Sequence, residues 1–305
     1  MIKKAFIFVL TIMLFLVCVK AKEKKKYLAL GDSITAGYRL ANPEEDAFAS
    51  IFSKKYDFEL TNEAVTGDKS SALLEKLPNY NIDDYDVISI CIGANDVLRD
   101  FIDKFLDLST EEMIEFLNNV ENDEEFNKQI DENLVNLDKN LEKIMEIVKS
   151  GHAQIYMMNV YNPYRKNYIP ALEKLADKYM HKLNAVIEKY AKEVHFVNLY
   201  RGMANKKGIL INSQSLTTIY DPHPNVEGHK AIADILGEKY YQNNLETKNL
   251  VLAIVVGIIA IALETVEVIY TSKKFLMKPK FEDRPKNNNQ EKEEEKTSSS
   301  RFIRS

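Results

Sequence analysis

Cysteine is nearly absent from this sequence. Only Cys18 and Cys91 occur among its 305 residues, and two cysteines cannot anchor a disulfide scaffold or a cysteine-rich metal site. Glycine and proline are also modest, at 10 and 8 residues, while 45% of the chain is hydrophobic and 29% is charged. This composition excludes a collagen-like, repeat-tract or wholly disordered protein and is typical of a folded one.

A basic patch is lacking as well. The net charge is −5, Lys and Arg gather near the two ends, and acidic residues exceed basic ones in the middle of the chain. Nucleic-acid-binding domains carry a basic patch or stripe, so we expect no nucleic acid among the partners.

The first 21 residues are typical of an export signal peptide. Two lysines precede an apolar run at 5–19, which is short for a membrane span, and residues 19–21 (Val-Lys-Ala) resemble a small-x-small cleavage site. A lipoprotein anchor at Cys18 and an uncleaved signal anchor are the alternatives. Cys91 lies in the apolar run 87–92, which favours a buried, inert thiol.

A second apolar run, residues 249–270, is long enough for a transmembrane helix, because about 20 helical residues cross a membrane. Six Lys and Arg residues follow between 273 and 286, which by the positive-inside rule keeps that end in the cytoplasm. Glu264 and Glu267 share a helix face, and either reach for water at the cytoplasmic boundary or contact another membrane helix. Residues 271–305 are polar, and we expect a disordered cytoplasmic tail.

The intervening domain, residues 22–248, alternates between strand and helix patterns. Five short β-rich runs predict strands, at 27–30, 58–61, 87–92, 154–160 and 194–199. Apolar residues at three- and four-residue steps predict helices over 126–148 and 172–190, and a last helix is expected at about 228–241. This alternation indicates a parallel sheet with helices on both faces, whose ligands bind at the carboxyl ends of the strands.

Two connections of the domain allow two interpretations each. The long acidic segment 99–125 either caps the ligand site as a lid or is a plain insertion. The tetrapeptide at 161–164 (Tyr-Asn-Pro-Tyr) either lines an apolar groove or is only a rigid loop.

Polar residues suited to acyl transfer follow the first three strands. Ser33 can sit where a strand turns into a helix, with its N–H at the helix N-terminus, although an N-cap serine in an ordinary turn is the alternative. Gly67 lets a backbone N–H approach a ligand closely, and Asn95 can offer a side-chain N–H to an oxyanion. Asp96 can tie down loop amides. A turn glycine and an Asx turn are the corresponding alternatives.

The segment Asp221-Pro-His223-Pro lies near the end of the domain. Residues two apart in an extended chain point the same way, and a residue before proline is biased to extended backbone. Asp221 can therefore reach one imidazole nitrogen of His223 while the other faces Ser33. Nucleophile, base and orienting carboxylate in this order form the arrangement of serine hydrolases.

The other four histidines indicate no metal site, since no pair of them stands at metal-ligand spacing with a carboxylate. We expect no cofactor, and we expect His229 to serve as a cap or packing contact. The absence of a G-x-S-x-G sequence excludes the ordinary α/β-hydrolase type.

Together these blocks resemble the GDSL-like, or SGNH, hydrolase family. The resemblance covers about residues 26–242 and rests on residues 31–34 (Gly-Asp-Ser-Ile), 62–68, 93–96 (Gly-Ala-Asn-Asp) and 221–225 with Gly228. It implies a flavodoxin-like three-layer α/β/α sandwich with a five-stranded parallel sheet, and metal-independent esterase, lipase or thioesterase chemistry. Ser33 is then the nucleophile and His223 the general base, and the N–H groups of Ser33 and Gly67 and the side chain of Asn95 form the oxyanion hole.

Two departures from the family pattern matter. Ile34 replaces the usual Leu, which is conservative. The last block reads Asp-x-His where many members have Asp-x-x-His, so His223 is oriented either by Asp221 or, in a Ser–His dyad, by a backbone carbonyl.

The leading hypothesis is a single-pass cell-membrane esterase whose domain lies outside the cytoplasm and hydrolyses a small ester, a lipid or an acylated glycan. An acyltransferase with the same nucleophile is one alternative. A non-catalytic surface-binding module is another, but binding alone has no need of Ser, Asn and His together.

Overall fold

The computed structural model describes residues 23–99, 108–165, 170–213 and 220–276. The predicted signal peptide at 1–21 and most of the predicted tail lie outside these residues. The chain divides into two compact units, one up to Leu245 and one from Glu246 onward. The motif blocks all belong to the first unit.

Five parallel strands form one sheet in the order β2-β1-β3-β4-β5. They are β1 (Lys26–Gly31), β2 (Glu59–Asn62), β3 (Val87–Cys91), β4 (Gln154–Met158) and β5 (His195–Val197). Each lies at one of the five predicted runs. This strand order is that of flavodoxin-like sheets, with a switch point between β1 and β3. The predicted fold class is therefore confirmed.

β3 occupies the centre of the sheet and is buried along its whole length. It pairs with β1 from Val87 opposite Tyr27 to Cys91 opposite Gly31, and with β4 on its other side. A strand covered on both faces has no solvated side, which explains why its sequence is apolar without alternation. Cys91 is 3% exposed, which confirms the predicted burial of this thiol.

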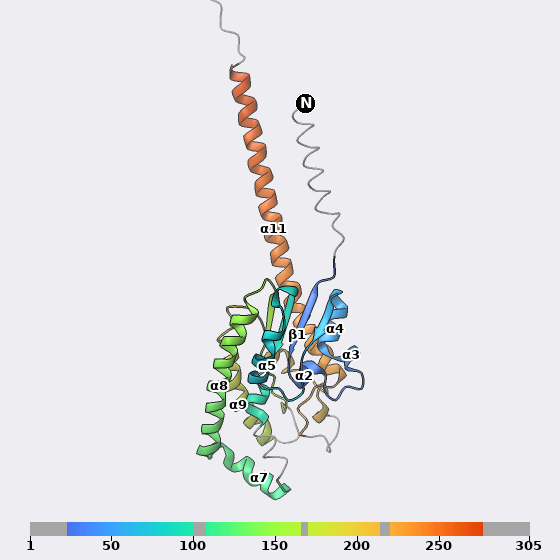
Figure 1. Ribbon diagram of the computed structural model, residues 1–305, viewed down its shortest axis with the longest axis vertical. Coiled ribbons are helices and arrows are strands. Elements are labelled where there is room, and N and C mark those ends of the chain that lie inside the picture. The colour runs from blue at the N-terminus through green and yellow to red at the C-terminus, as the bar shows by residue number, and fades with distance from the viewer. Residues whose placement is uncertain (1–22, 100–107, 166–169, 214–219, 277–305) are drawn as a thin grey trace, which may run out of the picture. The chain divides into compact units, whose positions relative to one another are not determined.

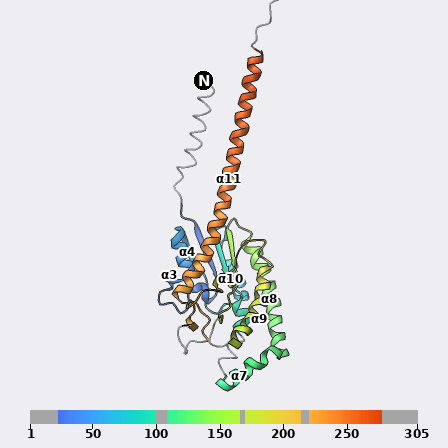
Figure 2. The same ribbon diagram turned by 180° about the vertical axis from the view of Figure 1, so that it is seen from behind.

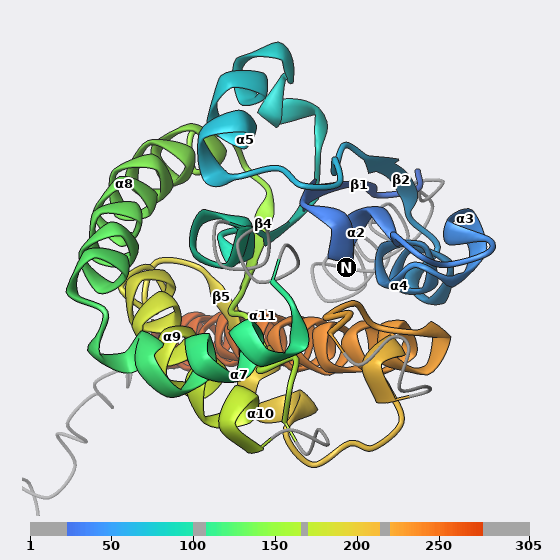
Figure 3. The same ribbon diagram turned by 90° about the horizontal axis from the view of Figure 1, so that it is seen from below.

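Alternate residues of the strands face two hydrophobic clusters, one on each side of the sheet. Leu28 and Leu30 of β1 belong to the first, which packs under α5 (Ser70–Lys76), α8 (Glu124–Val148) and α9 (Pro170–Glu188). Figure 3 shows these three helices along one side of the sheet. The apolar positions predicted for 126–148 are the buried positions of α8.

Tyr27 and Ala29 of β1 face the second cluster, which packs against α4 (Phe48–Tyr56), α10 (Leu199–Met203) and the first turns of α11 (Val226–Leu276; Figure 2). Its centre is aromatic: the ring of Phe52 lies 5.3 Å from that of Tyr27 and 5.6 Å from that of Tyr240, both edge to face. Such pairs each stabilise the fold by about 0.5–1.5 kcal/mol beyond their burial. The predicted last helix thus supplies the third layer.

α11 continues without a break from the domain into the second unit. The sequence predicts separate helices at 228–241 and 249–270, but the residues between them include no proline or glycine that would end the first. The large apolar side chains from 250 to 270 are exposed. Among the described helices, α11 alone is long and apolar enough to cross a membrane.

The segment predicted as a lid or insertion contains α7 (Thr110–Asn119) and a short 3-10 helix, η3 (Val120–Asn122); residues 100–107 lie outside the described part. Ser109 caps α7 with a reciprocal hydrogen-bond pair to Glu112. The ring of Phe116 lies edge to face with Phe126 of α8, at 5.9 Å. α7 therefore packs on the domain next to α8 and α9 (Figure 1).

The remaining connections hold short helices. They are α2 (Ser33–Ala36), α3 (Pro43–Asp46), η1 (Leu77–Asn79), η2 (Ile82–Asp84) and η4 (Ile211–Ser213).

Candidate active site

Ser33 is the first residue of α2 and follows β1 after a single intervening residue, Asp32. The Asp32 carboxylate caps this helix by accepting the N–H of Ile34 at 3.0 Å. Gly37 ends the helix in the left-handed conformation, with φ +73°, and the N–H of Tyr38 donates to the Ser33 carbonyl at 2.9 Å. These local bonds hold Ser33 at the carboxyl edge of the sheet.

Gly31 is required at the end of β1 by close packing. A Cβ atom at this position would lie 2.2 Å from Oγ1 of Thr35 and 2.6 Å from the carbonyl oxygen of Cys91. Any side chain there would push the turn away from β3. The turn can carry Ser33 directly over the strand because the glycine leaves this space empty.

A continuous set of hydrogen bonds joins Ser33, His223 and Asp221. Nε2 of His223 lies 3.0 Å from Oγ of Ser33, and Nδ1 lies 2.7 Å from Oδ1 of Asp221. The same Oδ1 accepts the backbone N–H of His223 at 3.0 Å. Of the two partners left open by the Asp-x-His spacing, the structure places the Asp221 carboxylate, not a backbone carbonyl, beside Nδ1. An Nδ1–H donated to this carboxylate leaves the Nε2 lone pair facing the serine hydroxyl.

The pKa values of the two carboxyl groups of the site, Asp32 and Asp221, are shifted in opposite directions. Burial raises the pKa of Asp32 to about 7, against the opposing effect of the Ile34 hydrogen bond. Burial also acts to raise the pKa of Asp221, but the hydrogen bonds from His223 and the charges of His223 and Arg39 outweigh it and hold that pKa below its usual value. Asp221 is therefore the anionic partner of His223 at neutral pH.

Two tyrosines in the loop after β4 form hydrogen bonds to the segment that carries His223. The hydroxyl of Tyr161 donates to the carbonyl of Pro222 and that of Tyr164 to the carbonyl of Tyr220, both at 2.9 Å. The N–H of Ile211 donates to the His223 carbonyl at 2.9 Å. The two tyrosines were predicted only as a groove wall or part of a rigid loop, and their support of the Asp221 segment was missed.

Two of the predicted oxyanion donors lie on segments that are tied together. Nδ2 of Asn95, in the helical turn after β3, donates to the carbonyl of Asp68 at 2.9 Å, and the residue before Asp68, Gly67, has φ +87°. Asp96 ties down the start of α5: its carboxylate accepts the N–H of Ser70 at 2.9 Å and the Ser70 hydroxyl at 2.5 Å. Asn95 and Ser33 line one cavity, and Gly67 is not among its lining residues.

That cavity has a volume of about 70 Å³. Ser33, Asn95 and His223 open onto it beside mostly apolar neighbours: Ile34, Ala94, Leu98, Val160, Tyr161, Pro163 and Pro222. An apolar pocket with a few convergent polar groups is the usual form of a small-ligand site. The wall that includes Tyr161 and Pro163 agrees with the groove interpretation of the loop after β4.

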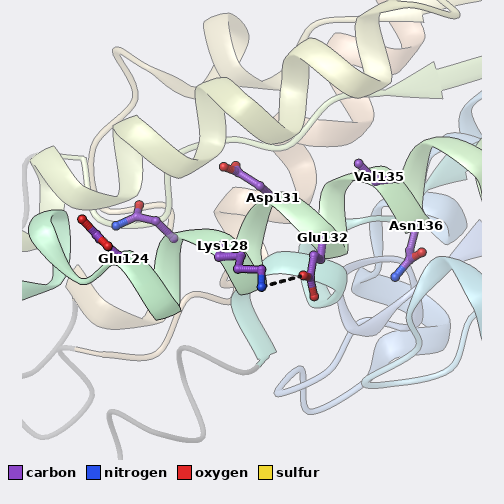
Figure 4. A pocket seen from close by; sticks show the side chains of 7 residues that line it. Glu124, Lys128, Asp131, Glu132, Val135 and Asn136 are labelled. Carbon is purple, nitrogen blue, oxygen red and sulfur yellow. Dashed lines mark ion pairs between the residues drawn. The ribbon is translucent and has the colours of Figure 1, made fainter.

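Two other features lie outside this cavity. Figure 4 shows a shallow hollow along α8, whose charged side chains include the exposed ion pair of Lys128 and Glu132, 3.9 Å apart. His229 of α11 is fully buried and accepts the N–H of Phe48 at Nδ1, which makes it a packing contact, as predicted. Within the described residues, no three His, Cys, Asp or Glu side chains lie together in a way that could hold a metal ion.

Tyr38 and Arg39 were not predicted as site residues. The Tyr38 ring lies 4.8 Å from the imidazole of His223, and Nε of Arg39 lies 3.2 Å from Oδ2 of Asp221. Nothing in the local sequence marks these contacts, because each joins residues more than 180 positions apart. Only the tertiary structure reveals these two contacts.

These features define a flavodoxin-like α/β fold in which a serine, a histidine and a carboxylate are joined by hydrogen bonds at the carboxyl edge of the sheet. A sequence model of the GDSL-like Lipase/Acylhydrolase family matches residues 29–231, which include all four motif blocks. The chain belongs to this family, and is thereby a hydrolase of ester bonds.

Individual proteins are also similar to this chain. Over 236 residues the chain is 27% identical to the uncharacterized protein YpmR of Bacillus subtilis (strain 168), which covers 70% of this chain and 80% of that protein. It is 29% identical over 113 residues to an arylesterase of Vibrio mimicus, covering 35% of this chain and 55% of that enzyme. Phospholipase A1 from Streptomyces albidoflavus NA297 has the same fold, with a TM-score of 0.56 at 18% identity over 71% of this chain and all of that one.

Proposed function

We propose that this protein is a metal-independent serine esterase that forms an acyl-enzyme on Ser33. The observation that carries the proposal is the hydrogen-bond sequence from the Ser33 hydroxyl through His223 to Asp221, on the wall of an apolar cavity. Nucleophile and base stand within direct proton-transfer distance, and the base is oriented by a third group.

The reaction then proceeds in two steps. His223 removes the hydroxyl proton of Ser33 as Oγ attacks the ester carbonyl carbon. The resulting oxyanion is stabilised by the N–H groups of Ser33 and Gly67 and the side chain of Asn95. Collapse breaks the ester bond, and His223 returns the proton to the departing alcohol. Water, deprotonated by His223, attacks the acyl-enzyme and releases the carboxylic acid and free Ser33.

The size of the cavity favours a short acyl group. A buried water needs about 10–15 Å³ of cavity volume, so the cavity volume of about 70 Å³ holds about five water molecules. A second cavity lined by apolar and aromatic side chains, including Phe126 and Leu172, shares Leu98 with it but has a volume of only about 10 Å³. A longer chain would have to displace Leu98, so we expect acetyl to butyryl esters to react faster than octanoyl and longer ones in a panel of p-nitrophenyl esters.

The location of the enzyme follows from α11 and the sequence around it. We propose residues 249–270 as a single transmembrane helix in the cell membrane, with the domain at 22–248 outside the cytoplasm and 271–305 inside. Supporting this are the exposed apolar side chains of α11 and the lysines that follow. Protease added to intact spheroplasts should digest the domain and spare a tag at the C-terminus; a protected domain with an accessible tag would reverse the orientation.

A fluorophosphonate probe tests the chemistry directly, since it labels an activated serine. Wild-type protein should be labelled, and Ser33→Ala should not. Ser71→Ala is the matched control, because Ser71 is exposed on α5 and should label like wild type. Unchanged labelling of Ser33→Ala would refute the assignment of the nucleophile. Addition of an alcohol acceptor in the ester assay separates an acyltransferase, which would yield the transferred ester, from an esterase.

A further inference from the structure

Arg39 has a backbone conformation that arginine rarely adopts. The N–H of Leu40 donates to the carbonyl of Gly37 at 3.1 Å, and this closes a four-residue turn. Arg39 is the third residue of the turn, with φ +74°, a position that favours glycine. Asp57 is the other non-glycine residue with positive φ in the described part of the chain, and it simply ends α4. Strained residues of this kind concentrate at functional sites.

The side chain of Arg39 reaches the site from this turn. Its Nε lies 3.2 Å from Oδ2 of Asp221, whose side chain is 10% exposed, against 56% for Arg39. Its guanidinium also lies 5.2 Å from the centre of the Tyr38 ring, which in turn lies edge to face with the His223 imidazole at 4.8 Å. The segment 33–39 therefore supplies Ser33 and contacts the other two members of the proposed triad, His223 and Asp221.

The two oxygens of Asp221 are divided between different partners. Oδ1 receives both the side-chain and the backbone N–H of His223, whereas Oδ2 faces Arg39. A carboxylate held through one oxygen can still rotate about its Cβ–Cγ bond. A charged donor on the second oxygen fixes the plane of the group, and with it the direction of the bond to Nδ1.

We propose that Arg39 is a positioning residue for catalysis, which orients His223 through the outer oxygen of Asp221. The proposal rests on the proposed serine-esterase function and adds a residue to it. Arg39 touches neither Ser33 nor the reacting atoms, and its effect passes through Asp221.

The charge of Arg39 has a second consequence, for the pH dependence of the base. His223 faces Ser33, Tyr38 and the carboxylate of Asp221, and it interacts electrostatically with Asp32 and with His229, whose pKa is lowered by burial to about 4 so that this imidazole is neutral near pH 7. Tyr161 and Tyr164 lie near Asp221. Arg39 offsets part of the negative charge beside His223, so its removal should shift the acid limb of the kcat/KM profile to higher pH.

The test is a set of variants assayed on p-nitrophenyl acetate across pH. Arg39→Gln should lower kcat by roughly tenfold and shift the acid limb of the kcat/KM profile upward by about half a pH unit. Arg39→Lys, which keeps the charge, should restore most of the shift but less of kcat. Lys55→Gln is the matched control: it removes another exposed cation that pairs with a carboxylate, Asp234, and should behave as wild type.

A double-variant cycle decides whether Arg39 acts through Asp221. In the Asp221→Asn background, Arg39→Gln should cause little further loss of kcat. Equal losses in both backgrounds, or an unshifted pH profile with unchanged kcat, would overturn the proposal.

Arg39→Gly removes the guanidinium and relieves the positive φ at once. It should melt at the wild-type temperature or above and still lose the same activity as Arg39→Gln, which separates positioning from folding. Ser33→Ala is assayed in parallel. Activity retained by Ser33→Ala would refute the serine mechanism itself, whereas an inactive Ser33→Ala beside a fully active Arg39→Gln would refute only the role of Arg39.

Discussion

The nucleophile turn, residues 32–39, and the base segment, residues 220–225, meet at the same cavity but are held in different ways. The nucleophile turn is fixed mainly by local bonds, through the Asp32 side-chain cap and the Tyr38 N–H to the Ser33 carbonyl, with one longer-range bond from Nδ2 of Asn62 to the Thr35 carbonyl at 3.1 Å. The base segment is neither helix nor strand over Tyr220–His223. Its carbonyls are held by Tyr161, Tyr164 and Ile211, all from other loops.

This difference indicates which substitutions should lower activity. A turn held mainly by contacts within five residues reforms when the local chain folds, so distant substitutions other than that of Asn62 should leave it in place. The base segment takes its geometry from groups far away in the sequence, so substitutions that touch neither substrate nor triad should still change the rate. The predictions below probe both regions, from the largest expected effect to the smallest.

Substitution of Ser33 in the nucleophile turn, or of His223 in the base segment, should have the largest effect on kcat. Ser33→Ala and His223→Ala should each lower kcat by about 10⁴ or more, and the double variant should be no worse, because the two residues act as one unit. Ester hydrolysis by purified proteins of unchanged circular dichroism measures this. Comparable activity in Ser33→Ala would remove the nucleophile turn from the mechanism.

Asp221→Asn tests the shortened Asp-x-His spacing of the base segment. If the carboxylate holds the imidazole as its 2.7 Å contact indicates, the amide should favour the wrong tautomer and lower kcat by up to about 10⁴. Stopped-assay kinetics beside His223→Ala gives the comparison. A loss under about tenfold would indicate a Ser–His dyad, with Asp221 serving only the turn.

Asn95→Ala removes the one side-chain donor proposed for the oxyanion. We expect kcat to fall by roughly 10² to 10³, with a smaller change in KM, because the charge develops mainly in the transition state. Steady-state kinetics on one ester separates the two constants. A weaker KM at unchanged kcat would assign Asn95 to ground-state binding instead.

Asp32 carries the main electrostatic cost of the nucleophile turn. Its folded pKa of about 7 lies above the unfolded value of about 3.9, so the wild type should lose stability as pH rises from 4 to 7. Asp32→Asn keeps an acceptor for the Ile34 N–H without the charge. It should be more stable than wild type at pH 8, by at most about 4 kcal/mol, and equal to it at pH 4.

Thermal melting at the two pH values measures this difference. Asp57→Asn, at an exposed carboxylate, controls for the loss of a charge as such. A constant difference between Asp32→Asn and wild type at both pH values would mean that folding does not raise the pKa of Asp32.

Tyr161→Phe keeps the ring on the cavity wall and removes only the hydroxyl that holds the base segment, so it should have the smallest effect. Loss of its bond to the Pro222 carbonyl should cost about 1 kcal/mol of stability and lower kcat a few-fold. Tyr80→Phe, which loses a hydroxyl bonded to Glu63 away from the cavity, should cost stability without changing kcat. Equal kcat in both variants would show that the base segment is held without Tyr161.

Much of this architecture was predictable from local sequence. Hydrophobic periodicity marked the five strands and the buried faces of α8 and α9, because side-chain burial repeats with the period of the element itself. The positions of Ser33 and Asn95 followed from the rule that ligands meet the carboxyl ends of parallel strands, whereas His223 was identified from the Asp-x-His-Pro pattern. The continuity of α11 was missed, because polar residues between 242 and 248 looked like a boundary although none of them ends a helix.

The sequence by itself thus determined the strand and helix segments, their order along the chain and the groups available for acyl transfer, with Asp221 in reach of His223, since each depends on residues a few positions apart. Tertiary structure alone decided that Tyr161 and Tyr164 support the base segment and that Arg39 holds the outer carboxylate oxygen of Asp221. These last contacts join turns separated by about 60 to 180 residues. Hydrogen bonds and ion pairs depend on distances within a few tenths of an ångström, and only the packed sheet and its helices bring such distant groups to those distances.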